Sequence, residues 1–467
     1  MYVQQIYTGC LSEAAYFVES NGEAIIIDPL RDTEEYIQLA NEHNAKIKYI
    51  FETHLHADFI SGHLDLSKQT GAPIIYGPGA ETNFAFHLAK DGEIFKIGNI
   101  TLEVIHTPGH TLESTCYLLR DENNKPYCIF TGDTLFVGDV GRPDLSSGNL
   151  TSAELASIMY DTIQNKLMPL PDDVIVYPAH GPGTSCGKNL GPETMSTMGE
   201  QKKTNYAMQP QSREEFIKAV ITGLEEAPPY FSVNARINKE GYSSLDDVKR
   251  KGLTPLTVTE FKQKIDKDVI VLDTRSAEEF SQGFIPGSVF IGLEGRFAEW
   301  AGSLLPFYQR MVLVTDTGKE EETIVRLARV GFDNVEGYLK GGFPEWEKAG
   351  EAIDMLIEVE ADELALDLPY DTNITVLDVR NEAEFAEGHV KDAISLPLSD
   401  MTDIARIAQF HENQNIYVHC ARGYRSVIAS SLLKRQSYHN IRNIVGGFAK
   451  IKEQKNIITE KQASVLN

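Results

Sequence analysis

Short apolar runs separated by polar turns dominate the first 60 residues. Three of these runs have the length and composition of β-strands, at 5–8, 14–19 and 23–28. A helical pattern of apolar positions follows at 33–43, and a further apolar strand at 47–51. This mixture of strands and helices predicts an α/β fold for the N-terminal part of the chain.

The second half of the chain repeats itself after 105 residues. The string VLDTR at 271–275 returns as VLDVR at 376–380, and GGF at 341–343 returns at 446–448. A period of this length corresponds to a whole domain, because solenoid repeats are much shorter. Each copy alternates apolar strands with helical stretches, which predicts two small parallel α/β domains.

Two polar segments, at 251–254 and 352–360, are predicted to be linkers between these blocks. They divide the 467 residues into three domains, at 1–250, 251–354 and 355–467. We therefore expect a multidomain α/β protein.

Charge and composition narrow the class of protein. The chain has 43 Lys and Arg against 68 Asp and Glu, a formal net charge of -25, which disfavours a nucleic-acid partner. Five Cys do not make a disulfide framework. No apolar run approaches the roughly 18 residues that a membrane span needs, and the first residues do not resemble a signal peptide. We expect a cytoplasmic enzyme without a membrane partner.

Imidazole and carboxylate side chains follow four of the predicted strands. They occur in the strings THLHAD at 53–58, TPGHT at 107–111, TGDT at 131–134 and PAHG at 178–181. Scattered polar loop residues would explain any one of these strings, but not four in the same context. Since loops at one edge of a sheet can converge on a single ion, they predict a site for Zn or Fe.

Together these four strings resemble the metallo-β-lactamase fold. The resemblance implies an αββα sandwich with its metal at one edge. Two-metal hydrolases of this fold usually continue the first string with another His, but here the next residue is Phe59. Because a phenyl ring cannot ligate, we expect a single ion.

The string GDVGRPD at 138–144 is similar to the persulfide dioxygenase branch of this fold. That branch implies one Fe(II) per chain, held by two His and one carboxylate. Such a set leaves about three open positions for water, O₂ and a substrate sulfur. Carried onto this sequence, the ligands are His54, His110 and Asp133, while His56, Asp58 and His180 orient ligands and bound water.

Two further residues are candidates for contact with the substrate. Arg142 either holds a substrate carboxylate or forms a buried ion pair with Asp144. Cys186 follows His180 on a glycine-containing loop, so it is either a second thiol at the metal pocket or a structural thiol.

A third chemical feature lies in the last domain, where the apolar strand 416–419 ends at Cys420. Backbone N–H groups at the start of the following helical stretch, 427–434, would stabilise a thiolate or bound anion. Arg422 and Arg425 add positive charge, so we expect an acidic, nucleophilic thiol rather than a structural one.

Two families use such a loop. Tyrosine phosphatases have Cys-x5-Arg, whereas this loop has the shorter Cys-x4-Arg. The shorter loop, with the LDVR, EF and GGF strings around it, resembles rhodanese sulfurtransferases. That resemblance implies a persulfide carried on Cys420.

The middle domain keeps the scaffold of this family and loses its reactive groups. Thr315 occupies the position of Cys420, or Asp316 does after a shift of one residue, and the position of Arg425 falls among Glu320–Glu322. We expect an inactive rhodanese-like domain that serves packing or oligomer contacts, in a protein that forms a homo-oligomer.

The order of the three domains resembles bacterial multidomain persulfide dioxygenase–sulfurtransferases. This implies oxidation of a low-molecular-weight persulfide, of glutathione or another thiol, by O₂ to sulfite. Sulfur transfer through Cys420 then gives thiosulfate. The alternative is a zinc-dependent thioester hydrolase similar to glyoxalase II, and a non-enzymatic persulfide carrier or sensor is a third possibility.

Overall fold

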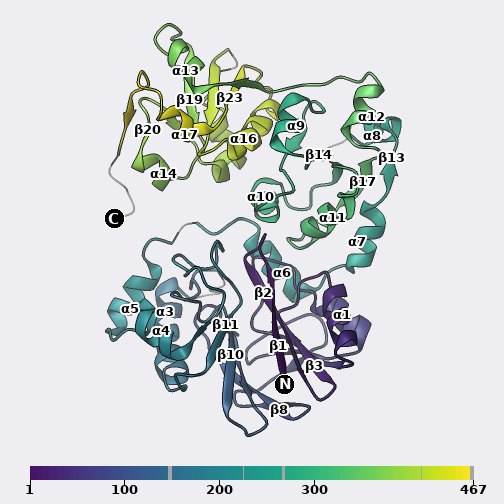
Figure 1. The fold of residues 1–467 in the computed structure, drawn as a ribbon, viewed down its shortest axis with the longest axis vertical. Coiled ribbons are helices and arrows are strands. Elements are labelled where there is room, and N and C mark those ends of the chain that lie inside the picture. The colour runs from purple at the N-terminus through teal and green to yellow at the C-terminus, as the bar shows by residue number, and fades with distance from the viewer. Residues whose placement is uncertain (146–149, 225, 266–268, 412, 463–467) are drawn as a thin grey trace. The chain divides into compact units, whose positions relative to one another are not determined.

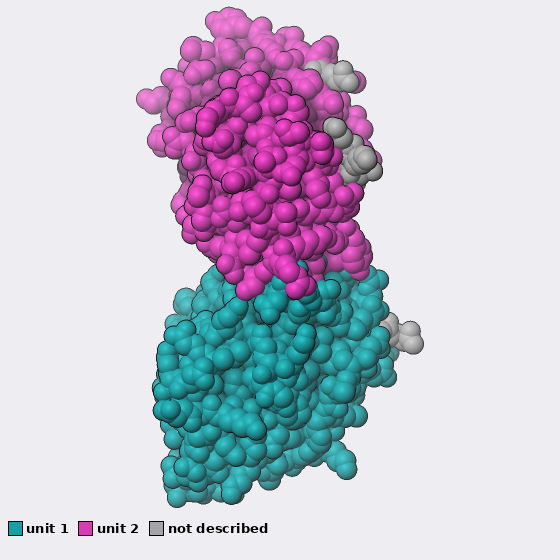
Figure 2. Space-filling model, turned by 90° about the vertical axis from the view of Figure 1, so that its right-hand side faces the viewer, with its two compact units in different colours: residues 1–247, 327–331 teal, residues 248–326, 332–467 magenta. Residues whose placement is uncertain are grey.

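The computed structural model describes residues 1–145, 150–224, 226–265, 269–411 and 413–462 (Figure 1). The chain forms two compact units, coloured separately in Figure 2. Unit 1 comprises Met1–Asp247 with Leu327–Gly331, and unit 2 comprises Val248–Arg326 with Phe332–Asn467.

Two six-stranded sheets form the centre of unit 1. The first has the order β1-β2-β3-β4-β5-β6 and the second the order β12-β11-β10-β9-β8-β7. Their strands are β1 (Tyr2–Thr8), β2 (Glu13–Ser20), β3 (Glu23–Ile27), β4 (Lys46–Glu52), β5 (Ile74–Tyr76), β6 (His87–Leu88), β7 (Ile94–Ile97), β8 (Ile100–His106), β9 (Thr115–Arg120), β10 (Pro126–Gly132), β11 (Ile175–Pro178) and β12 (Ser196–Thr197).

The two sheets pack face to face. Alternate residues of each sheet point into one apolar cluster, which includes Ile25 and Phe51 of the first sheet and Leu102 and Phe130 of the second. Unit 1 also contains α1 (Glu34–Glu42), α2 (His63–Thr70), α3 (Ser152–Thr162), η1 (Ile163–Leu167), α4 (Met198–Thr204), η2 (Tyr206–Met208), α5 (Arg213–Ile221) and α6 (Phe231–Glu240).

Helices cover the outer faces of both sheets. Tyr36 of α1 packs with Ile26 and Ile50 of the first sheet, and Met159 of α3 packs with Leu118 of the second. The expected αββα sandwich is therefore confirmed, and all four strands predicted in the first 60 residues are present.

Unit 2 contains two five-stranded sheets with the same strand order. They run β13-β17-β16-β14-β15 and β18-β23-β22-β19-β21, and β20 and β24 form a separate pair. The strands are β13 (Pro255–Leu256), β14 (Ile270–Asp273), β15 (Val289–Phe290), β16 (Met311–Val314), β17 (Val335–Leu339), β18 (Ile357–Val359), β19 (Ile374–Asp378), β20 (His389–Val390), β21 (Ile394–Ser395), β22 (Asn415–His419), β23 (Ile441–Ile444) and β24 (Thr459–Glu460).

The pairings within both five-stranded sheets are parallel, as the repeat predicts. Helices connect the strands: α8 (Val258–Ile265), α9 (Ala277–Gln282), α10 (Phe297–Leu304), α11 (Glu320–Ala328), α12 (Phe343–Lys348), α13 (Ala361–Asp367), α14 (Glu382–Glu387), η3 (Leu398–Thr402), α15 (Ile404–Ile407), α16 (Tyr424–Arg435) and α17 (Gly447–Ile451). A further helix, α7 (Leu245–Gly252), spans the division between the units.

One predicted linker is wrong in part. Within 352–360, Ile357–Val359 forms β18, an edge strand paired with β23. Its pattern of Ile, Glu and Val is too short to stand out from a polar segment, and its partner strand comes far later in the chain.

The two copies in unit 2 share one apolar core. Phe284 and Phe290 of the first copy cluster with Val418 and Leu433 of the second. Ser431 receives a 3.0 Å hydrogen bond from the backbone N–H of Phe290. The Tyr424 hydroxyl, at the start of α16, donates a 3.1 Å hydrogen bond to the carbonyl oxygen of Gly292.

Among the described residues, no helix has the length and apolar character that crossing a membrane requires.

Candidate metal centre and thiol loop

The strand ends of unit 1 bring the predicted metal residues together. His54, His110, Asp133 and His180 follow β4, β8, β10 and β11 respectively, and each of these side chains is buried. Parallel β10 and β11 end at the same edge of their sheet, which places Asp133 beside His180. The four loops thus lie together at one edge of the sandwich, and their role as a metal site stays a prediction.

The first group at this edge consists of His54, His110 and Asp133. Oδ2 of Asp133 lies 3.5 Å from Nε2 of His110 and 3.9 Å from Nε2 of His54. With ligand bonds of about 2.0–2.2 Å, ligands of one ion lie about 3–3.5 Å apart, so only a small inward shift is needed. Both carboxylate oxygens of Asp133 are buried without a hydrogen-bond partner, as expected of a carboxylate that faces a cation.

The outer ring nitrogens of both imidazoles are held by hydrogen bonds. Nδ1 of His110 lies 2.8 Å from the carbonyl oxygen of Arg142, and Nδ1 of His54 lies 3.0 Å from the hydroxyl of Thr53. The Thr53 hydroxyl itself donates to Asp28. A proton on each Nδ1 leaves the lone pair of Nε2 directed to the centre.

Burial and the neighbouring imidazoles lower the pKa of His54 well below its usual value. The neutral imidazole is the form that binds a metal. The donor set of this group thus fits a bound metal ion.

The second group consists of Asp58, His180 and Cys186, whose possible ligand atoms lie within 4.8 Å of one another. Nε2 of His180 is 3.3 Å from Oδ2 of Asp58 and 3.5 Å from Oδ1 of Asp133. Asp133 therefore links the two groups through its two oxygens. Burial, and then the charges of Asp58 and Asp133, raise the pKa of the Cys186 thiol, which favours its protonated form.

His56 turns away from the first group. Its Nε2 lies 3.0 Å from Oδ1 of Asp28 and 3.5 Å from Oε2 of Glu52. Burial lowers the pKa of His56, but the charges of Asp28, Glu52 and Asp58 together outweigh burial and raise this pKa to about 9. Phe59 packs on His56, with ring centroids 4.3 Å apart.

Asp28 and Glu52 were not predicted as site residues. The signal that could have found them is a carboxylate directly at the end of an apolar strand, as Asp28 is after β3 and Glu52 is in β4.

Arg142 forms one of the two arrangements expected of it. Its Nε and Nη2 donate to the two carboxylate oxygens of Asp144 at 2.7 Å each, and Nη1 donates to the carbonyl oxygen of Ser185. The ion pair with Asp144 is thus present, and contact with a substrate carboxylate stays a prediction.

The thiol loop of unit 2 lies between β22 and α16. The backbone N–H of Gly423 donates to Sγ of Cys420 at 3.1 Å, which stabilises negative charge on sulfur. Helix α16 begins at Tyr424, three residues before the predicted start, so Arg425 lies in its first turn.

The backbone of the GGF string packs against this loop and donates a hydrogen bond to it. The backbone N–H of Phe448 donates to the carbonyl oxygen of Cys420 at 2.7 Å. A Cβ on Gly447, whose φ is +57°, would lie 2.3 Å from that oxygen. Glycine is therefore required for this close approach.

The two arginines of the loop differ in environment. Arg425 forms a double hydrogen bond with Glu384, from Nη1 to Oε2 at 2.7 Å and from Nη2 to Oε1 at 2.8 Å. Arg422 is exposed to solvent. Glu384 was not predicted as a site residue, although its occurrence in both copies as Glu-Phe was a usable signal.

The first copy has no thiol at this place. Thr315 follows β16 as Cys420 follows β22, and Glu320 begins α11. Whether this copy lacks activity stays a prediction.

A prediction follows from the packing of the metal loops. A Cβ on Gly141 would lie 2.1 Å from the carbonyl oxygen of Asp133 and 2.9 Å from Nδ1 of His110. Gly141→Ala should therefore displace both groups and weaken metal binding by about 10–100-fold, as loss of other supporting contacts does. Metal titration of the purified protein measures this. The control is Gly9→Ala, where nothing lies within 4 Å of the new Cβ, and equal affinity in both variants would contradict the assignment.

Comparison with known families agrees with this geometry. The model of the metallo-beta-lactamase superfamily matches residues 8–180, and that of the rhodanese-like domain matches 257–349 and 360–454.

Two curated relatives match part of the chain. A probable hydroxyacylglutathione hydrolase of Schizosaccharomyces pombe is 33% identical over 180 residues, covering 38% of this chain and 66% of the relative. The mitochondrial persulfide dioxygenase ETHE1 of Homo sapiens is 31% identical over 198 residues, covering 42% of this chain and 70% of the relative. The chain thus spans about two thirds of the length of each.

A solved structure extends the match. The metallo-beta-lactamase from Staphylococcus aureus is 33% identical with a TM-score of 0.64, covering 73% of this chain and 98% of that one. Family models, a relative of known function and this structure agree on the same fold and metal-binding enzyme family. The chain belongs to the metallo-β-lactamase superfamily and carries two rhodanese-like domains after its metallo-β-lactamase domain.

Proposed function

We propose that the chain oxidises a low-molecular-weight persulfide with O₂ and transfers sulfane sulfur through Cys420. Persulfide, O₂ and water give a thiol, sulfite and two protons. The Cys420 thiolate takes the outer sulfur of a second persulfide molecule and releases its thiol. Sulfite then takes that sulfur from the Cys420 persulfide, which leaves the Cys420 thiolate and thiosulfate. The observation that carries this proposal is a two-histidine, one-carboxylate group on the same chain as a thiol that accepts a backbone N–H bond.

The group formed by His54, His110 and Asp133 would hold one Fe(II). Such an ion, when bound, supplies redox chemistry with O₂ and open positions for a sulfur ligand. The protein contributes two imidazoles with fixed ring orientation and one carboxylate oxygen. His180, which is paired with Asp58, lies on the other side of Asp133, and both are polar groups that can orient water.

The thiol loop supplies the second half of the reaction. The N–H of Gly423 and the N-terminal end of α16 lower the cost of negative charge on Cys420, both as attacking thiolate and as leaving group. Arg425, fixed by Glu384, adds a permanent positive charge beside the loop. Exposed Arg422 is placed to attract the sulfite dianion.

The second candidate function is zinc-dependent thioester hydrolysis. It is favoured by the hydroxyacylglutathione hydrolase relatives, which are as similar in sequence as the persulfide dioxygenases. Phe59 and the turned His56 weigh against it, because both reduce the ligands available to a second ion.

The first test uses protein loaded anaerobically with Fe(II) in an oxygen electrode with glutathione persulfide. We expect O₂ uptake with release of sulfite equivalents. His110→Ala removes a proposed ligand and should therefore reduce the rate of O₂ uptake by more than about 100-fold. Loss of a group that only supports a ligand costs about 10–100-fold. The control, His439→Ala, changes an exposed His and should retain the rate. No uptake by the iron form, with thioester hydrolysis by the zinc form, would establish the second candidate instead.

The second test separates the two halves. Cys420→Ser should leave O₂ uptake unchanged and shift the product from thiosulfate to sulfite, because a hydroxyl cannot carry sulfane sulfur. Ion chromatography of both anions measures this, with Cys10→Ser, a substitution in unit 1, as control. Thiosulfate production by Cys420→Ser at the unsubstituted rate would refute a role for this thiol.

A further inference from the structure

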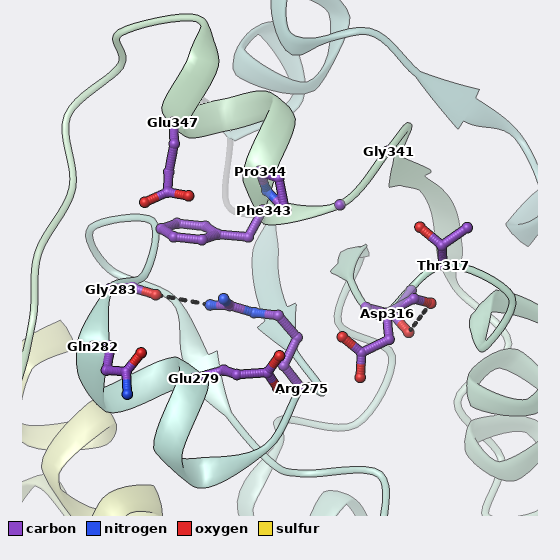
Figure 3. A pocket seen from close by; sticks show the side chains of 12 residues that line it. Arg275, Glu279, Gln282, Gly283, Asp316, Thr317, Gly341, Phe343, Pro344 and Glu347 are labelled. Carbon is purple, nitrogen blue, oxygen red and sulfur yellow. Dashed lines mark hydrogen bonds between the residues drawn. The ribbon is translucent and has the colours of Figure 1, made fainter.

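The first rhodanese-like copy contains a cavity of about 290 Å³. It lies where the strands β14 and β16 end, at the place that the thiol loop occupies in the second copy. Its lining includes Arg275, Glu279, Thr315, Asp316, Phe343 and Glu347 (Figure 3).

At the equivalent place in the second copy, a carboxylate binds an arginine side chain of the same domain. Glu384 there binds the guanidinium of Arg425 through two hydrogen bonds. Glu279 is the counterpart of Glu384, but the counterpart of Arg425 is Glu320, which accepts the backbone N–H of Gly318 instead. The first copy therefore keeps the carboxylate and has lost the guanidinium that its counterpart binds.

The remaining charges around the cavity favour a cation. Glu279, Asp316 and Glu347 are carboxylates, and Arg275 is the one basic residue of its described lining. Partial burial and the negative charge of Glu279 raise the pKa of Asp316. Two carboxylates that face the same space are relieved of repulsion when a cation lies between them.

The guanidinium of Arg275 is bound by other groups, although its charge still partly offsets those of Glu279 and Asp316. Its guanidinium donates to both oxygens of Asp273 and to the carbonyl oxygen of Gly283, and it lies 4.2 Å from the ring centroid of Phe343. Figure 3 shows Arg275 beneath the ring of Phe343, with Glu279 and Asp316 nearby.

The second copy contains the same arrangement. Arg380 donates to Asp378 and Gly388 and lies 3.9 Å from the ring centroid of Phe448. Arg425 nevertheless binds Glu384 in that copy. A second guanidinium is therefore compatible with the first.

We propose that the cavity binds a guanidinium group supplied from outside the domain, with Glu279 and Asp316 accepting its N–H groups. The planar fork of a guanidinium matches a carboxylate in two parallel hydrogen bonds, as the pair in the second copy does. The group has two possible sources, a small molecule or an arginine side chain of another protein. The middle domain would then be a recognition module rather than packing alone.

Isothermal titration of the full chain with L-arginine and L-citrulline tests the proposal. These ligands have nearly the same shape, and only arginine is cationic. We expect arginine to bind at least about tenfold more tightly than citrulline, because its hydrogen bonds are charge-assisted. A capped Gly-Arg-Gly peptide distinguishes the sources: tighter binding of the peptide indicates a protein, and tighter binding of free arginine a small molecule. Equal binding of arginine and citrulline, or none of arginine, overturns the proposal.

Two variants locate the site. Glu279→Gln should weaken arginine binding by about tenfold or more, since it removes the charge of the acceptor. Its control is Glu278→Gln, an exposed neighbour on α9 outside the lining.

Glu320→Arg restores an internal guanidinium at the position of Arg425 and should abolish arginine binding by filling the cavity. Because it adds the pair that the second copy already contains, its melting temperature should not fall. Unchanged arginine affinity in both Glu279→Gln and Glu320→Arg would place any binding elsewhere and refute this site.

Discussion

The two carboxylate oxygens of Asp133 are the constraint on which the metal centre depends. Both are buried and lack a hydrogen-bond partner, a costly state for an ionised group unless a cation compensates it. Oδ2 faces His110 and His54, while Oδ1 faces His180. One side chain at the end of one strand thus unites loops from both sheets of the sandwich.

The rhodanese-like copies show how a shared scaffold supports different chemistry. Arg275 and Arg380 make the same contacts in the two copies, with an aspartate, a backbone carbonyl and a phenyl ring. The differences at this place lie in the loop after the central strand, where Thr315 stands at the position of Cys420, and at the start of the next helix, where Glu320 stands at the position of Arg425. The fold therefore fixes where a ligand meets the domain, and a few loop residues decide which charge it must have.

Much of this could be read from the sequence, because it depends on local pattern. Strand periodicity and the 105-residue repeat predicted the early strands and the two parallel domains, and the resemblance carried by the four His and Asp strings implied the layered sandwich. The rest depends on side-chain direction and on contacts between distant segments. The turn of His56 toward Asp28, the pairing of Arg425 with Glu384 and the edge strand β18 are set by neighbours that no local pattern reveals.

The hydrogen bond from Tyr424 to Gly292 and the common apolar core make each copy part of the structural support of the other. Tyr424, the first residue of the helix after the reactive thiol, is held in place by a hydrogen bond to the first copy. The first copy needs no thiol to make these contacts, so its packing residues are constrained by the second copy even though its own loop is not. A protein consisting of the second copy alone would expose the shared apolar core and leave the Tyr424 hydroxyl without this acceptor. Other polar and apolar residues would have to replace those contacts.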